Sequence, residues 1–162
     1  MRKILDNLSL TLATGFYVSY IPAYIQPKKH WTGAGTLGTL WGFIFWTYVP
    51  LSPMPQLAVI AFSIALAFWA CGRAEAIMGV KDDQKIILDE WVGYWVAAAL
   101  LPRTALYRIS AFVLFRILDM WKGPLGKRLS KLPGGPGVVL DDILAGLTAN
   151  LALQAFRFFL SS

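Results

Sequence analysis

Carboxylates beside apolar segments are the residues of this chain best suited to chemistry. Five of the nine acidic residues lie in such places: Asp89 and Glu90 in ILDEWVGYWVAAALL, Asp119 in FVLFRILDMWKG, and Asp141 and Asp142 in GVVLDDILAGLTANLAL. An ionised carboxylate in apolar surroundings is costly unless it is paired with a cation or bound to a metal. The pattern therefore predicts a membrane-embedded, metal-dependent site.

The ligand types favour magnesium over the softer metals. The chain has one histidine, His30, and one cysteine, Cys71, so neither a histidine cluster nor a disulfide can form within it. Oxygen ligands suit Mg²⁺, which usually binds through one or two carboxylates together with substrate phosphate. Adjacent helical residues point about 100° apart. We therefore expect one of Asp89 and Glu90 to face an ion while the other orients water; the alternative is a charge pair at a helix N-terminus.

Basic residues accompany one of these acids. Arg116 and Asp119 are three residues apart and share a helix face, and Lys122 continues that face near the helix end. A strip of cation, carboxylate and cation suits a phosphate held beside a metal-bound carboxylate. A plain intrahelical ion pair is the alternative.

Two further motifs precede predicted helices. Asp141 and Asp142 open the last predicted helix after a Gly-rich turn. They are expected to belong to the site, and the alternative is that they cap the N-terminus of that helix. Residues 33–38 match G-x-G-x-x-G, but no strand precedes them, which argues against a dinucleotide fold. A Gly-rich turn leading into a helix can cradle phosphate with backbone N–H groups, aided here by Thr36 and Thr39. Tight helix packing is the alternative.

Composition predicts an all-α membrane bundle in a single domain over residues 1–162. The chain is 57% hydrophobic and only 15% charged. Apolar segments cover 38–49, 56–72, 86–101, 105–119 and 138–160, after an amphipathic, interfacial region at 1–32. Several are shorter than the roughly 20 residues that a full span requires. If successive segments run antiparallel, the glycine motif and all five acids lie at one end of the bundle.

The charge pattern predicts which side of the membrane that end faces. Most of the 15 basic residues lie at the motif end: Arg2, Lys3, Lys28, Lys29, Arg73, Lys81, Lys85, Lys122, Lys127, Arg128 and Lys131. At the other end lie Arg103, Arg108 and Arg157. The positive-inside rule makes the motif end cytoplasmic. A net charge of +6 spread between apolar segments favours anionic lipid over nucleic acid as the partner.

Together the motifs resemble the phosphatidylglycerophosphatase A family. The resemblance rests on GTLGT at 35–39, DEWVG at 89–93, FRILDMWK at 115–122 and DDILAG at 141–146. It implies an all-α fold in which a central helix is surrounded by others. It also implies Mg²⁺-dependent hydrolysis of phosphatidylglycerophosphate to phosphatidylglycerol at the bacterial inner membrane. Ala34 and Thr39 depart from the family's Pro-Gly-Thr-x-Gly-Ser, and Gly123 is inserted before Pro124, but every acid is retained.

The expected enzyme is thus an integral membrane lipid phosphatase with its active site on the cytoplasmic side. The acids would supply metal ligands and a carboxylate base, while the basic residues and the glycine motif would bind phosphate. The expected metal ligands are Asp89, Glu90, Asp119, Asp141 and Asp142, and the phosphate-binding residues are Gly35, Thr36, Gly38, Thr39, Arg116 and Lys122. Asp89, Glu90, Asp119, Arg116 and Lys122 are the expected catalytic residues.

Two alternatives remain open from the residues. A non-catalytic transporter or ion-pathway protein would also place acids in apolar helices, but it predicts acids spread through the bilayer depth. A soluble relative acting on another phosphoester is the second.

Overall fold

The structure is a computed structural model that describes residues 2–25 and 33–161, and within these ranges it contains helices and no strand. The elements are α1 (Arg2–Ala13), α2 (Tyr20–Ile25), α3 (Ala34–Phe45), a 3₁₀ turn η1 (Trp46–Tyr48), α4 (Pro53–Met78), α5 (Leu88–Ala98), α6 (Ala105–Met120), α7 (Pro124–Leu129) and α8 (Gly135–Ser161). The predicted all-α fold is confirmed.

The five predicted apolar segments correspond to α3, α4, α5, α6 and α8, with different ends. Helix α4 continues through polar residues to Met78 and stops where Gly79 adopts a left-handed conformation, with φ of 68°. Helix α8 begins at Gly135, earlier than expected. Sequence reasoning missed α2 and α7. The latter begins at Pro124, which suits a first helical turn because its missing N–H needs no partner there.

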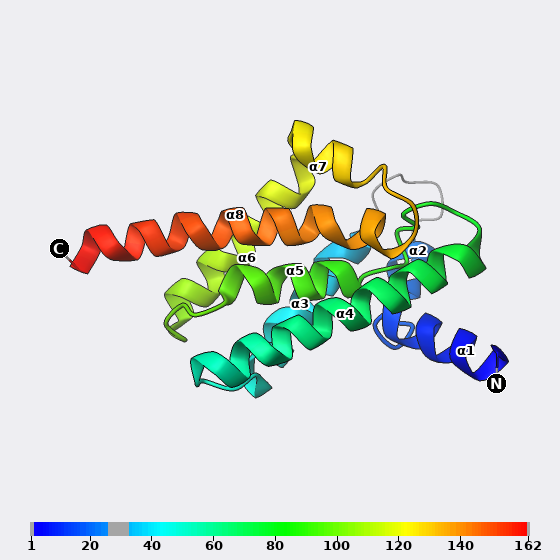
Figure 1. Cartoon of the computed structure of the whole chain (residues 1–162), viewed down its shortest axis with the longest axis horizontal. Helices are drawn as coiled ribbons and strands as arrows, with labels where there is room; N and C mark the ends of the chain where they lie inside the picture. The colour runs from blue at the N-terminus through cyan, green and yellow to red at the C-terminus, as the bar shows by residue number, and fades with distance from the viewer. Residues whose placement is uncertain (1, 26–32, 162) are drawn as a thin grey trace.

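Helix α5 is the centre of the bundle. It packs against α8, α3, α6 and α4, and its first turn also contacts α1, so that Figure 1 shows it between α8 and α4 with α3 and α6 behind. A helix contacted on all sides must be apolar all round. Val92, Tyr94, Trp95 and Ala97 are accordingly buried. The central helix implied by the family resemblance is confirmed.

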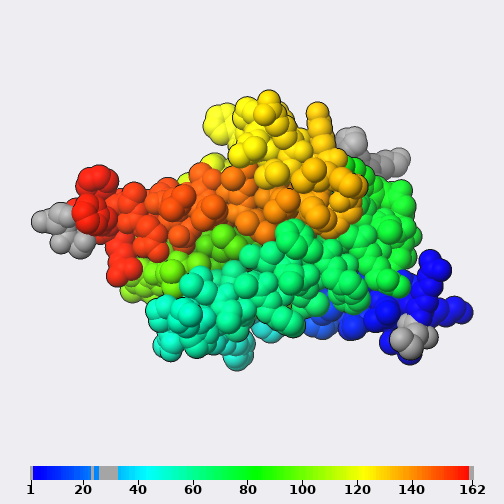
Figure 2. Space-filling view, viewed as in Figure 1, coloured from blue at the N-terminus to red at the C-terminus, as the bar shows by residue number. Residues whose placement is uncertain are grey.

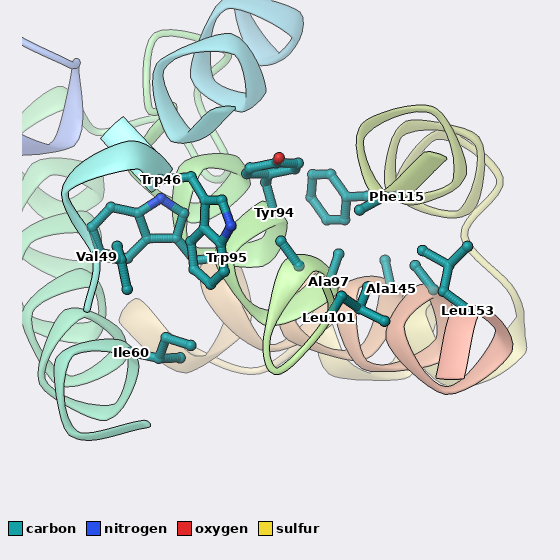
Figure 3. Packing of buried hydrophobic residues seen from close by; sticks show 13 residues of the cluster. Trp46, Val49, Ile60, Tyr94, Trp95, Ala97, Leu101, Phe115, Ala145 and Leu153 are labelled. Atoms are coloured by element: carbon teal, nitrogen blue, oxygen red, sulfur yellow. The ribbon is translucent and has the colours of Figure 1, made fainter. Parts of the chain in front are cut away.

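An aromatic core fills the C-terminal half of α5 and its neighbours (Figure 3). Trp46, Tyr94, Trp95 and Phe115 belong to this cluster, together with smaller residues from α8. The Trp95 Nε1–H donates to the Gly42 carbonyl at 2.9 Å. This hydrogen bond ties α5 to α3 and satisfies the one polar group of a buried indole.

Glycine allows α5 and α8 to approach closely. A Cβ at Gly93 would lie 2.7 Å from the Phe115 ring and 3.1 Å from the Asp142 carbonyl oxygen. A Cβ at Gly146 would collide with the Gly93 carbonyl. These close contacts hold α8 against α5 and so keep the second turn of α8 near the start of α5.

Two helices in the described ranges are long and apolar enough to cross a membrane, judged by length and composition: α4 and α8. At 1.5 Å per residue, their 26 residues extend about 39 Å. They form adjoining bands on the face drawn in Figure 2. Leu147, Leu151, Phe158 and Phe159 on α8 are exposed, as a lipid-facing surface requires. The other helices are shorter, as expected.

The N-terminal region supports the segment that leads into α5. The Ile87 N–H donates to the Ala13 carbonyl at 2.8 Å, and the Ser19 hydroxyl donates to the Lys85 carbonyl at 2.6 Å. Arg73 pairs with Asp6 at 2.8 Å, which attaches α1 to α4. Lys28, Lys29 and His30 lie outside the described residues, so the interfacial role of 1–32 stays a prediction.

We predict that Gly93→Ala lowers the free energy of unfolding by about 1–3 kcal/mol, because the buried Phe115 ring must move to admit the new methyl group. Gly126→Ala is the matched control: its Cβ would meet neighbours at 3.6 Å or more, which is ordinary contact. Thermal unfolding in detergent measures both. An unchanged melting temperature in Gly93→Ala would contradict the close approach described here.

Candidate active site

Four segments far apart in sequence surround one cavity of about 310 Å³. The cavity is lined by 33–36 at the start of α3, by 82–84, Ile86, Asp89 and Glu90, by Arg116, Asp119, Met120 and Lys122, and by Asp142. It lies at the end of the bundle where α4 ends and α8 begins, on the right in Figure 1. The predicted convergence of the motifs on one end is confirmed.

Three carboxylates meet in this cavity. Asp89, Glu90 and Asp142 each offer an oxygen atom, and these atoms all lie within 4.8 Å of one another. The expectation that only one of Asp89 and Glu90 could face a common point is wrong. Although adjacent Cβ atoms diverge on a helix, the two side chains are flexible enough to bring their oxygens together with that of Asp142.

Two of these three carboxylates, those of Asp89 and Glu90, each have an oxygen without a partner in the part of the chain that the structure describes. Among the described residues, Asp89 Oδ1 and Glu90 Oε2 are buried without a hydrogen-bond donor. Both acids lie in the first turn of α5, outside the two long helices. Burial raises the pKa of Asp89 well above its ordinary value and raises the pKa of Glu90 from 4.5 to about 7. A divalent cation would supply the missing partner, so the residues present fit a metal.

The glycine motif positions α3 against α5. Gly33 is left-handed, with φ of 78°, and α3 begins at the next residue, so the motif lies inside a helix rather than in a turn. A Cβ at Gly35 would collide with Glu90, and one at Gly38 would collide with the Ile87 carbonyl. Close helix packing, the alternative raised by the sequence, is therefore what Gly38 does.

The same motif also contributes to the cavity. Gly35 and Thr36 line it, whereas Gly38 and Thr39 do not. The buried Thr39 hydroxyl donates to the Gly35 carbonyl at 3.0 Å. Phosphate binding by the glycine motif stays a prediction. The part of the motif that borders the cavity is the N-terminus of α3.

Each cation of the cavity has a carboxylate partner. Arg116 Nη1 lies 2.5 Å from Asp119 Oδ2, which is the intrahelical ion pair that the sequence offered as the alternative, and it also donates to the Thr39 hydroxyl at 3.5 Å. Lys122 follows the end of α6 and pairs instead with Asp141, with Asp82 at 3.8 Å. Burial alone would lower the pKa of Lys122, but its hydrogen bond to Asp141 and the charge of that acid outweigh burial and raise it.

Asp141 and Asp142 lie in the second turn of α8, so their interpretation as N-cap residues is wrong. Helix α8 begins six residues before Asp141, after the left-handed Gly134. Adjacent positions on a helix point in different directions. Asp142 consequently lines the cavity while Asp141 meets Lys122 beside it.

Sequence reasoning missed part of the lining. Asp82, Asp83 and Gln84, in the loop before α5, and Met120 on α6 line the cavity but were not named as site residues from the sequence. Asp82 is left-handed, with φ of 52°, and its N–H donates to Glu75 Oε1 at 3.2 Å. The sequence feature that could have identified this part of the lining is the acid pair Asp82 and Asp83, which stands just before the apolar segment 86–101.

Comparison with known proteins agrees with this arrangement. The family model described as Phosphatidylglycerophosphatase A matches residues 11–157. Phosphatidylglycerophosphatase A of Escherichia coli (strain K12) is 35% identical over 116 residues, which cover 70% of this chain and 67% of that protein. The Haemophilus influenzae protein of the same name is 32% identical over 128 residues, covering 74% and 78%.

Another relative has a different name. A Bacteroides thetaiotaomicron protein called "Putative phosphatidylinositol-3-phosphatase" is 32% identical over 162 residues, covering 93% of this chain and 94% of its own length. No solved structure matches the chain. With the family model matching most of its length, and with four motifs meeting at one cavity, the chain belongs to the phosphatidylglycerophosphatase A family of phosphatases.

Proposed function

We propose that this protein hydrolyses phosphatidylglycerophosphate to phosphatidylglycerol and phosphate in a Mg²⁺-dependent reaction. The observation that carries the proposal is the cavity itself, in which three carboxylates that form no ion pair within residues 2–25 and 33–161 face the same space as two cations. That combination suits a phosphate monoester bound beside a divalent metal. The names of two relatives supply the substrate.

The residues take complementary roles in this proposal. Asp89, Glu90 and Asp142 would hold Mg²⁺, which when bound neutralises phosphate charge and lowers the pKa of a coordinated water. Arg116 and Lys122 bind the phosphate oxygens, and the start of α3 at Gly35 and Thr36 adds the positive end of a helix dipole. A carboxylate of the cavity accepts the proton of the attacking water.

The position of the cavity suits a substrate held in a bilayer. It lies at the same end of the bundle as the end of α4 and the start of α8, the two helices able to cross a membrane, and Asp142 of α8 lines it. A lipid phosphate lies at the membrane surface while its acyl chains stay in the hydrocarbon, so a site at one end can reach it. The transporter alternative is not supported, because the chain belongs to an enzyme family and its acids gather at one end.

A second substrate is favoured by one observation. The relative named for phosphatidylinositol 3-phosphate matches more of this chain than the two phosphatidylglycerophosphatases do. Both lipids are phosphate monoesters carried by a diacylglycerol lipid, and the cavity residues named above would bind the phosphate of either.

A lipid panel decides between these substrates. Purified protein in mixed micelles is given phosphatidylglycerophosphate, phosphatidylinositol 3-phosphate or phosphatidic acid, and phosphate release is measured. We expect the highest kcat/KM with phosphatidylglycerophosphate. Activity should be lost in excess chelator and restored by Mg²⁺. Full activity at a verified absence of metal would disprove the metal site.

Cys71→Ser should keep most activity, because Cys71 is fully buried.

The metal-free protein should lose stability as pH rises. The folded-state pKa of Glu90, about 7, exceeds its ordinary 4.5, so its protonation favours the folded state below 4.5 and this contribution is lost between pH 4.5 and about 7. The melting temperature in chelator should thus be lower at pH 7.5 than at pH 5, with a smaller difference in Glu90→Gln. Added Mg²⁺ should raise it most at pH 7.5. A melting temperature that rises with pH would contradict this.

The cavity should face the cytoplasm, as the basic residues predict. In a Cys71→Ser background, Lys131→Cys marks the cavity end and Tyr48→Cys marks the opposite end, and both positions are exposed. An impermeant thiol reagent added to intact cells should label Tyr48→Cys and leave Lys131→Cys unmodified until the cells are opened. Labelling in the reverse pattern would overturn the orientation.

A further inference from the structure

We propose that the five acids divide into two groups with different tasks. Asp89, Glu90 and Asp142 form the metal group, whereas Asp119 and Asp141 are positioning residues that hold Arg116 and Lys122 where the substrate phosphate binds. This inference rests on the proposed function and assigns separate roles within it. It narrows the sequence-based expectation, which gave all five acids to the metal.

The surroundings of Asp141 are the first reason. Its side chain is 2% exposed, and Lys122 is its ion-pair partner. Asp141 does not line the cavity, while Lys122 does. Its oxygens have no other hydrogen-bond donor among the described residues. A buried carboxylate beside one ammonium group is a counter-ion. Asp141 therefore acts on the cavity through Lys122.

Asp119 and Arg116 form a second ion pair, in which Asp119, unlike Asp141, also lines the cavity and lies beside Asp142. They lie one turn apart on α6, and the pair is mostly buried, with 15% of the Arg116 side chain and 11% of the Asp119 side chain exposed. Arg116 makes both of its contacts in the described residues through Nη1, and its Nε has no acceptor there. The pair thus fixes the guanidinium and leaves donors over for an anion such as phosphate.

The chemistry of the metal is the third reason. Mg²⁺ is octahedral, keeps several waters and binds substrate phosphate, so the three carboxylates of the metal group leave no coordination position that Asp119 or Asp141 needs to fill. In the metal group the oxygens of Asp89, Glu90 and Asp142 already lie within 4.8 Å of one another, and this group includes neither Asp119 nor Asp141. If those two bound the metal, Arg116 and Lys122 would lose their counter-ions in a largely buried site.

A double-mutant cycle tests the division. The variants are Asp141→Asn, Lys122→Met and their combination, with Asp142→Asn for the metal group. Asp6→Asn is the matched control, since it breaks an ion pair that lies away from the cavity. Each protein is measured for Mn²⁺ affinity, for inhibition by inorganic phosphate at saturating Mg²⁺, and for KM and kcat.

We expect Asp141→Asn to bind Mn²⁺ within about threefold of the unchanged protein, whereas Asp142→Asn loses about 100-fold. Phosphate should bind Asp141→Asn and Lys122→Met about tenfold more weakly, as expected when a charge-assisted contact is lost. The combined variant should be no weaker than Lys122→Met alone, because Asp141 acts only through that lysine. Asp6→Asn should leave Mn²⁺ and phosphate binding unchanged.

Two outcomes would overturn the division: a loss of Mn²⁺ affinity in Asp141→Asn as large as that in Asp142→Asn, or phosphate-binding losses that multiply in the combined variant. If Asp141→Asn does not fold, Asp119→Asn with Arg116→Met gives the corresponding cycle on the other pair. An unchanged protein that binds no Mn²⁺ would disprove the proposed metal site, and the coupling seen in phosphate binding would still decide the division.

Discussion

The constraint on which the rest of the structure depends is the burial of carboxylates in an apolar bundle. Asp89, Asp119, Asp141 and Asp142 are all less than a tenth exposed. Each needs a partner, because an isolated buried charge costs several kcal/mol. Arg116 and Lys122 supply two partners, and the remaining acids face one cavity. A divalent cation in this cavity would supply the partner that these acids need, which is the basis of the metal site proposed above.

Holding such a site requires helices that approach closely and a start of α5 that cannot move. Gly38 and Gly93 let α3 and α8 contact the α5 backbone, where any larger residue would collide. The carbonyl of Ala13 fixes the residue before α5 through its hydrogen bond to Ile87. Because Asp89 and Glu90 lie in the first turn of α5, each of these contacts sets the direction of a carboxylate. The stability of the bundle and the geometry of the site therefore come from the same contacts.

Much of the fold could be predicted because apolar runs and breakers in this chain are clear, and antiparallel order alone placed the motifs at one end. What could not be predicted depends on local detail. The partner of Lys122 was missed because α6 ends at Met120, which directs the lysine toward α8 instead of along α6. The N-cap interpretation of Asp141 failed because Gly135 and Pro136 enter the helix, a choice set by packing of Gly135 against Phe68. Side-chain direction, unlike helix content, requires tertiary contacts.

A lipid phosphatase must accept two incompatible groups, a charged phosphate and apolar chains. In this bundle the polar and the apolar surfaces lie at different positions along the helix axes, rather than on opposite sides of each helix. The cavity lies at one end of the bundle, near the start of α8, while exposed Leu and Phe side chains follow α8 from Leu147 to Leu160, and α8 extends away from that end (Figure 1). A charged headgroup can then reach the acids of the cavity without any charge entering the hydrocarbon layer, and the acyl chains need not leave it. The acids lie near the ends of the helices rather than midway along them. This position allows a site built from short helices to lie at the surface of a bilayer.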